Sequence, residues 1–456
     1  MSGVPEMEVP PAIASVTTAG PQLSDRAKAA MKGDDGFFQA LVAKLTGEQY
    51  SLETPNGIVN AGLAENSLMA DWFLEYSKKL ELTYNDLTYG DSLTGSRRIF
   101  AALSKLFDRY FHAIKTVESK HIVCGVGLGA VLDQLCDKIC DPGDGILIAA
   151  PYYSGFDNDF GARALVRAIC VDLPEDMDPA SSETLEVFEA KITEMKLKGE
   201  NPKAVLLCNP HNPLGFIYPK KTLLEYCRFC ERHNLHLYCP QMLKPNVKEH
   251  PPFVSLLSID VEEEAQCNPA RVHVVYGMSK DFGANGLRIG LLVSQHNPEL
   301  IGSFGATAVF MKVSSPADQL WSSILNNDSI LGYYVEEAQS RASESFNYTL
   351  DWLEKMDIKH SNPVSGHFIW IDLRPYLPKE DKKGQPQSDP RQQELDLFQR
   401  FLNDQNVYVA PGMIYHSATP GFFRLTFTLR RVLLDEGLKR MELALNEVKK
   451  RNQEIN

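Results

Sequence analysis

The stretch RVHVVYGMSKDFGANGLRIG, residues 271–290, decides the fold, because it joins an apolar strand to a glycine-containing loop with a lysine at the junction. The run RVHVVYG is rich in β-branched residues, which is typical of a strand covered on both faces. Lys280 follows that strand, and Arg288 follows the lysine by eight positions. Burying a lysine is costly without a chemical role. Desolvation weakens its ammonium form, so the sequence predicts a nucleophilic amine that can form an imine.

Similar apolar runs lie before and after this stretch, separated by amphipathic helical segments. They predict six further strands: HIVCGVG, GILIAA, ALVRAICVD, KAVLLCN, LHLYCP and LRIGLLVS. Such strands, alternating with helices, predict an α/β fold with a mainly parallel seven-stranded sheet covered on both faces. Ligands bind such sheets beyond the carboxyl ends of the strands. The loops that follow the strands are therefore the expected location of the site.

The sequence pattern divides the chain into four parts. They are a flexible N-terminal arm and helix at 1–50, the N-terminal part of the small domain with entry helices at 51–115, a large domain at 116–330, and a smaller α+β domain at 331–456. The arm is predicted from a Pro-, Ser- and Thr-rich start without apolar periodicity. The polar stretch PKEDKKGQPQSDPRQQ, residues 378–393, is predicted to be a mobile surface insertion.

The composition argues against several classes of protein. The 456 residues carry a net charge of −13, so no general basic surface is expected to bind nucleic acid or an anionic membrane. No apolar run is long enough to span a membrane, and the first residues lack a secretory-signal pattern. The nine cysteines, an odd number, predict reduced thiols in a cytoplasmic protein. The lone C-x-x-C pair, Cys227 and Cys230, predicts helix packing rather than a metal site.

Four segments at predicted strand ends carry complementary chemistry. CGVGLGAVLDQL places glycines where a strand turns into a helix, and free backbone N–H groups there attract phosphate. APYYSGF offers an aromatic platform, and NPHNPLGF offers an amide fixed between prolines. Lys280 supplies the amine and Arg288 a guanidinium that can grip phosphate. A phosphorylated aldehyde suits these parts, and pyridoxal 5'-phosphate (PLP) is the obvious candidate.

With these motifs the chain resembles the class I/II aminotransferase family of fold-type-I PLP enzymes, and within it the 1-aminocyclopropane-1-carboxylate (ACC) synthase-like branch. The matching blocks are NAGLAENSL, PYYSGF, NPHNPLG, SKDFGANGLRIG and PGFFRLTF, in the family's order over about residues 50–450. The resemblance implies the fold of PLP-dependent transferases, with a large domain and a smaller one. It also implies a homodimer that acts on small amino-acid-type substrates.

The resemblance further implies roles for individual residues. Lys280 would hold PLP as an internal aldimine and then move the proton at the substrate α-carbon. Tyr153 would stack on the pyridine ring, and Asn212 would hydrogen-bond its phenolic oxygen. Arg424 would bind the substrate α-carboxylate. Outside this context, Tyr153 and its neighbour Tyr152 could be core aromatics, and Arg424 could pair with a structural carboxylate.

The remaining implied roles concern the two ends of the cofactor. The phosphate would contact five residues: Gly129, Ala130, Ser279, Arg288 and, reaching across from the partner subunit, Tyr89. The substrate end would be lined by Ala64 and Glu65.

The sequence departs from the family where the cofactor's ring nitrogen would lie. The strand NLHLYCPQML should end in a D-E-x-Y signature, but Pro240 stands at the aspartate, Gln241 follows it, and Leu243 stands at the tyrosine. No acid occurs between Glu231 and Glu249 to replace that aspartate. A carboxylate there keeps the ring nitrogen protonated, which stabilises the electron pair left when an α-proton departs. The amide of Gln241 could supply only a weaker hydrogen bond.

Two smaller departures affect the phosphate end and the lysine block. Ala130 stands where a hydroxyl residue is usual, and Gly277 replaces a serine. Together the departures favour the hypothesis that transamination is impaired, while elimination of a leaving group from the β- or γ-carbon is less affected.

The sequence thus predicts a PLP-dependent enzyme that acts on an α-amino acid or an amino-acid-derived intermediate. The reaction is either elimination, including the carbon–sulfur lyase chemistry of fungal secondary metabolism, or transamination. Two alternatives remain open. The chain could bind a ligand without normal PLP chemistry, or Lys280 could form an imine with a substrate carbonyl without PLP.

Overall fold

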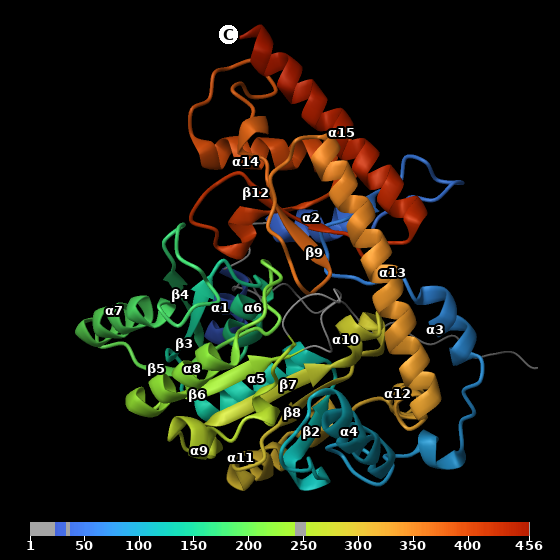
Figure 1. Cartoon of the computed structure of the whole chain (residues 1–456), viewed down its shortest axis with the longest axis vertical. Coiled ribbons are helices and arrows are strands. Elements are labelled where there is room, and N and C mark those ends of the chain that lie inside the picture. The colour runs from blue at the N-terminus through green and yellow to red at the C-terminus, as the bar shows by residue number, and fades with distance from the viewer. Residues whose placement is uncertain (1–22, 33–36, 242–251, 456) are drawn as a thin grey trace, which may run out of the picture.

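A mainly parallel seven-stranded sheet forms the centre of the molecule in the computed structural model, which describes residues 23–32, 37–241 and 252–455 (Figure 1). In sheet order the strands are β2 (Ile122–Gly125), β8 (Gly290–Val293), β7 (Val272–Gly277), β6 (His236–Pro240), β5 (Pro202–Leu206), β3 (Gly145–Ala150) and β4 (Arg167–Asp172). Strand β8 is antiparallel to both of its neighbours, and the other pairs are parallel. The predicted sheet is confirmed, because each apolar run forms one of its strands.

Helices cover both faces of this sheet, as its mostly buried strands require; the edge strand β4 is the most exposed. One face packs against α5 (Leu128–Ile139), α6 (Gly155–Gly161) and α11 (Pro298–Ser303). The other packs against α4 (Arg97–Tyr110), α7 (Thr184–Leu197), α8 (Lys220–His233), α9 (Val261–Ala265) and α12 (Ser315–Leu325). Successive residues of β7 alternate between the two cores, with Val274 on the second face and Val275 on the first. Cys227 and Cys230 lie in the second core, on α8.

The smaller part of the molecule is built on two short sheets. Strands β11 (Ala410–Pro411), β12 (Phe422–Thr426) and β9 (Phe368–Asp372) form an antiparallel sheet, and β1 (Val59–Asn60) pairs in parallel with β10 (Val407–Tyr408). These strands share a third core with α2 (Phe37–Leu45), α14 (Pro390–Gln399) and α15 (Arg431–Glu454). The remaining helices are α1 (Asp25–Lys32), α3 (Ala70–Ser77), α10 (Met278–Asp281) and α13 (Asp328–Lys355).

The long helix α13 joins the two parts of the molecule. Its first turns contribute Leu331 and Tyr334 to the core on the second face of the large sheet. Its later turns contribute Phe346 and Leu353 to the third core. Figure 1 shows α13 running from α12 up to the small sheets. The predicted boundary at 330/331 falls within its first turn, and the division into domains stays a prediction.

Three observations concern the other sequence predictions. The arm at 1–22 and Leu243 lie outside the described residues. The polar stretch 378–393 forms a hydrogen-bonded turn, in which Asp381 N donates to Gln385 O at 2.9 Å, before α14 begins at Pro390. None of the described helices is long and apolar enough to cross a membrane.

Candidate active site

Lys280 lies in the short helix α10, directly after β7, at the carboxyl end of the central strands. Its Nζ donates a hydrogen bond of 2.6 Å to the carbonyl oxygen of Ala64. The pKa of Lys280 is lowered to about 8, chiefly by burial and then by the positive charges of Arg424 and Arg288, with Glu65 opposing them. Most of this amine is protonated near physiological pH, but its neutral fraction, the form that attacks a carbonyl carbon, is far larger than in a free lysine.

Arg288 and the start of α5 face the same space. Arg288 follows the 3₁₀ helix η5 (Asn285–Leu287) with a φ of +54°, and its Nη1 donates to the carbonyl of Asn285 at 3.0 Å. Gly127 precedes α5 with a φ of +94°, and a Cβ there would overlap Arg288 Nη2. No side chain caps this end of α5, so its first N–H groups are available. A guanidinium beside a free helix start forms an anion cradle.

Arg424, on β12, is a buried cation without a carboxylate partner among the described residues. Its Nη1 donates to Asn212 Oδ1 at 2.9 Å, and its Nη2 donates to Gly62 O at 2.5 Å. The rings of Phe368 and Tyr415 lie 4.3 and 4.8 Å from its guanidinium carbon. A buried guanidinium without an anion is costly. The arrangement therefore suits a carboxylate that arrives with a ligand.

The same contact orients the amide of Asn212. Because Asn212 Oδ1 accepts from Arg424, the amide nitrogen is left to donate elsewhere. A donor at this position matches the role that the resemblance implies, in which Asn212 bonds the cofactor's phenolic oxygen.

The structure distinguishes the two adjacent tyrosines that follow β3. Tyr152 is buried, its hydroxyl donates to Asp157 Oδ1 at 2.8 Å, and its ring stacks on His416 with centroids 4.5 Å apart. Tyr153 is 38% exposed and contacts Phe156 edge to face. Tyr152 is thus a core residue, and Tyr153 is the more exposed of the two rings and the one available for stacking.

The other predicted site residues occupy varied positions. Ala130 and Gly129 lie on the first turn of α5, and Ser279 precedes Lys280 on α10, each half-buried. Glu65 is exposed next to the buried Ala64. Tyr89 is 75% exposed on the surface, so within one chain it does not join the others. Its predicted role in a partner's site stays a prediction.

At the expected ring-nitrogen position, Pro240 ends β6 and is buried. The amide of the next residue, Gln241, is already paired: its Oε1 accepts from Ser255 Oγ at 2.7 Å, and its Nε2 donates to Cys239 Sγ at 3.4 Å. The idea that Gln241 could hydrogen-bond the ring is therefore not supported by its contacts. The described residues offer no replacement for the missing acid at the end of β6.

Two residues near this site escaped the sequence analysis. His367, just before β9, is buried, and neither ring nitrogen has a hydrogen-bond partner among the described residues. The pKa of His367 is lowered to about 3, chiefly by burial and then by the charges of Lys280 and Arg424. Asp159, on α6, packs against Gly129. Neither residue belongs to a motif, so only the folded structure reveals their proximity to the site.

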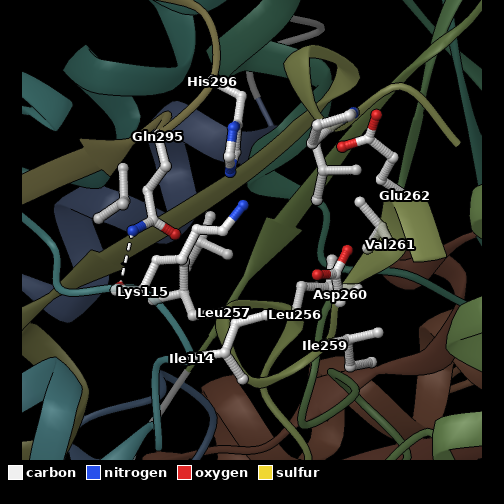
Figure 2. Close-up of a pocket in the computed structure, with 14 residues that line it drawn as sticks. Ile114, Lys115, Leu256, Leu257, Ile259, Asp260, Val261, Glu262, Gln295 and His296 are labelled. Atoms are coloured by element: carbon white, nitrogen blue, oxygen red, sulfur yellow. Dashed lines mark hydrogen bonds between the residues drawn. The ribbon is translucent and has the colours of Figure 1, made fainter. Parts of the chain in front are cut away.

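A separate small pocket lies beside the ends of β7 and β8 that are far from Lys280 (Figure 2). Its walls include Val272 and Val293, and Gln295 Nε2 donates to Lys115 O beside it at 2.9 Å. Its cavity volume is about 40 Å³. Pockets for cofactor-sized ligands measure roughly 300–1,000 Å³. This pocket therefore does not compete with the site around Lys280.

The fold and the site together define an α/β enzyme that holds a phosphorylated carbonyl compound between a buried lysine and an anion cradle. Comparison with known proteins agrees. The chain belongs to the aminotransferase class I and II family, whose sequence profile matches residues 77–441.

Individual relatives support this membership. The chain is 30% identical over 436 residues, or 93% of its length, to the probable aminotransferase gliI of Aspergillus fumigatus, 96% of which is covered. It is 28% identical to a 1-aminocyclopropane-1-carboxylate synthase of Nicotiana tabacum, over 83% of this chain and 77% of that one.

Solved structures confirm the fold. A double mutant of Thermus thermophilus aspartate aminotransferase superposes over 93% of this chain and 100% of its own with a TM-score of 0.68 at 20% identity. Bna3p of Saccharomyces cerevisiae, a putative kynurenine aminotransferase, does so over 93% and 99% with a TM-score of 0.73 at 15% identity. The fold-type-I prediction is therefore confirmed.

Family membership also confirms that the chain is an enzyme and that its cofactor is PLP. The residues around the cradle fit that cofactor: the amine of Lys280, the guanidinium of Arg288, the open ring of Tyr153 and the amide of Asn212. The fit is incomplete at the ring-nitrogen end, where Pro240 replaces the usual acid.

Proposed function

We propose that this chain acts on an α-amino acid, or an intermediate derived from one, and that it favours elimination of a β- or γ-leaving group over transamination. The observation that carries the preference is Pro240 at the end of β6, beside a Gln241 amide that is already paired. A substrate with sulfur on its β-carbon would make the chain a carbon–sulfur lyase.

The chain's own residues divide the work of binding and proton transfer. Arg424 binds the α-carboxylate and so fixes the direction of the substrate. Lys280 Nζ, whose pKa lies near 8, takes the proton from the α-carbon and can return it. When bound, PLP supplies an electron sink for the pair that this proton leaves behind. Arg288 and the start of α5 hold the phosphate, which keeps the reacting atoms in place.

The missing acid bears on what happens after the α-proton departs. With Pro240 at the end of β6, the chain supplies no carboxylate to hold a proton at the ring-nitrogen end, so the electron pair on the α-carbon is less stabilised. If a good leaving group stands on the adjacent carbon, that pair forms a double bond between the two carbons, and the leaving group departs with the electrons of its own bond. Transamination has no such outlet and depends more on the missing stabilisation.

Transamination remains the second candidate. It is favoured by the intact arrangement of Lys280, Asn212 and Arg424, and by the printed name of the Aspergillus relative, a probable aminotransferase. A third candidate, ligand binding without normal PLP chemistry, draws its support from Pro240 alone.

A direct comparison of rates separates these candidates. The PLP-loaded protein is given a cysteine S-conjugate, with pyruvate release measured, and separately alanine or glutamate with an acceptor keto acid. We expect kcat/KM for elimination to exceed that for transamination at least about tenfold, a difference of roughly 1.4 kcal/mol in barrier height. The variant Pro240→Asp should narrow the gap, and Lys280→Ala should abolish both reactions. Fast transamination of ordinary amino acids would contradict the preference, and inactivity in both assays would favour the ligand-binding candidate.

We also propose that the enzyme is a homodimer. Tyr84, Leu87 and Tyr89, in and after the 3₁₀ helix η1 (Tyr84–Leu87), are 75–84% exposed. Phe310, in η7 (Ala308–Met311), is 81% exposed. The η7 segment contacts β2, and Thr94, which follows Tyr89 in the chain, accepts a hydrogen bond from Cys124 N on the same strand. An exposed apolar surface of this kind is typical of a protein interface.

A cytoplasmic location is likewise a proposal. The nine cysteines are all free thiols in the structure, which is the state that a reducing compartment maintains.

A further inference from the structure

An acidic side chain, Asp159, lies beside the anion cradle, where a bound phosphate would repel its negative charge. Asp159 projects from α6 against the first turn of α5, so closely that a Cβ on Gly129 would lie 2.7 Å from Asp159 Oδ1. Gly129 belongs to the glycine-containing start of α5 that faces Arg288. Among the described residues, the Asp159 carboxylate has neither a hydrogen bond nor an ion pair, and Arg288 acts on it only as a nearby charge. A dianionic phosphate in the cradle would therefore meet an acid that no direct partner neutralises.

The surroundings of Asp159 favour its protonated form. The pKa of Asp159 is raised to about 6, chiefly by burial and then by the charge of Asp133 on α5, with Arg288 opposing them. Asp133 is itself paired with Arg163 at 2.7 Å. The hydroxyl of Tyr153 and the thiol of Cys136 are further titratable groups close to Asp159. Near neutral pH, Asp159 thus changes charge easily before any ligand arrives.

We propose that Asp159 is a further cofactor-binding residue, which takes up one proton from solvent when a phosphate enters the cradle and then faces it as a neutral carboxylic acid. In that form its O–H can donate a hydrogen bond to a phosphate oxygen, where a carboxylate could only repel it. The inference rests on the proposed function, because it requires that a phosphorylated cofactor occupies this cradle.

The expected pH dependence follows from linkage. A bound dianion disfavours the carboxylate, so Asp159 titrates at a higher pH with phosphate bound than without it. Below about pH 6 the acid is neutral in both states and does not alter the affinity. Above that pH, binding requires proton uptake, and the affinity falls by up to tenfold per pH unit until the bound form also titrates.

The test uses pyridoxamine 5'-phosphate, which carries the phosphate but no aldehyde and so needs no bond to Lys280. Its affinity for the full-length chain, freed of cofactor, is measured by calorimetry from pH 5.5 to 8.5. The proteins compared are the wild type, Asp159→Asn and Asp108→Asn, which removes an exposed acid on α4 and matches the loss of charge. The ligand's own ionisation affects all three equally, so affinity ratios isolate Asp159.

We expect Asp159→Asn to bind as the wild type does at pH 5.5 and about tenfold or more tightly at pH 8. Asp108→Asn should follow the wild type throughout.

A second measurement needs no variant. Calorimetry in buffers with different enthalpies of ionisation should show that the wild type takes up close to one proton on binding at pH 7.5. Parallel pH profiles or no proton uptake would overturn this inference alone. Failure of the wild type to bind at every pH would overturn the proposed function with it.

Discussion

Lys280 brings an amine into a space where its charge is unfavourable. The folded chain lowers its pKa from 10.5 to about 8, because the side chain is buried and two arginines lie near it. Below pH 8 the lysine is protonated in the folded and unfolded chains alike, so the folded state bears the full cost of the buried charge. Between pH 8 and 10.5 the unfolded chain binds a proton that the folded chain releases, so stability from this residue rises with pH.

This cost leads to a prediction for the cofactor-free protein. Lys280→Met replaces the cation with an apolar side chain of similar length, and it should raise the free energy of unfolding at pH 7 by about 1–3 kcal/mol. The gain should shrink as the pH approaches 10.5. Urea unfolding at pH 7 and pH 9.5 measures both effects.

The matched control for this variant is Lys105→Met, which changes an exposed lysine on α4 and should leave the unfolding free energy almost unchanged. Equal stability of Lys280→Met and the wild type at pH 7 would show that the amine is not destabilised by its surroundings.

At this scale, the sequence was informative where function imposes a motif. Lys280 and Arg288 stand in one block at a fixed spacing, and Arg424 follows a glycine turn in another. Asp159 and His367 have no such signal, because an isolated acid or histidine acquires its role only from tertiary packing. The hydrogen bond between Ser255 and Gln241 could not be predicted either, since it depends on where the loop that carries Ser255 lies in the fold.

At the scale of elements, ion pairs centred on Arg98 help to anchor the segment that carries Tyr89. Arg98, on α4, bonds Asp86 of η1 at 2.6 Å and Asp318 of α12 at 2.5 Å. The pKa of Asp86 falls to about 2, first through hydrogen bonds from the side chain and backbone of Thr83, and then through Arg98. The stability that Asp86 contributes is present above about pH 4 and is lost as the pH falls towards 2.

Removing this charge should loosen the segment. Asp86→Asn leaves Arg98 with one carboxylate, and we expect a loss of about 1–3 kcal/mol of stability with faster amide exchange at 82–93. The central sheet should keep its protection. Hydrogen exchange with mass spectrometry resolves the two regions.

Glu81→Gln serves as the control, because it changes an exposed acid at the edge of the same segment. If Asp86→Asn left exchange at 82–93 unchanged, the ion pairs with Arg98 would not be what holds the segment.

Elements were predictable where their apolar pattern is long. Each strand of the central sheet lies in a mainly apolar run, so its existence followed from the sequence, although its ends did not. The pair β1 and β10 could not be predicted, since each has two residues and they lie far apart in the chain. Such short pairings form because the third core brings the strands together.

At the scale of the whole molecule, a dimer would place Tyr89 near a neighbouring cradle. The double variant Leu87→Glu and Phe310→Glu puts charge on both exposed apolar segments and should convert the dimer to a monomer. Loss of the partner's Tyr89 should also weaken retention of PLP. Sedimentation velocity and the absorbance of bound cofactor report the two effects.

Leu197→Glu is the matched control, because Leu197 is 85% exposed on α7, away from η1 and η7. It should leave both readings unchanged. A wild-type protein that sediments as a monomer while retaining PLP would contradict the dimer proposal.

The proposed function depends on the amine at the end of β7. The most direct measurement is reduction of the PLP-loaded protein with borohydride, followed by digestion and mass spectrometry of the peptides. The account predicts a pyridoxyl phosphate mass on the peptide that contains Lys280 and its absence from Lys280→Ala. A protein whose Lys280 stays unmodified, or whose label is found on another lysine, would contradict it.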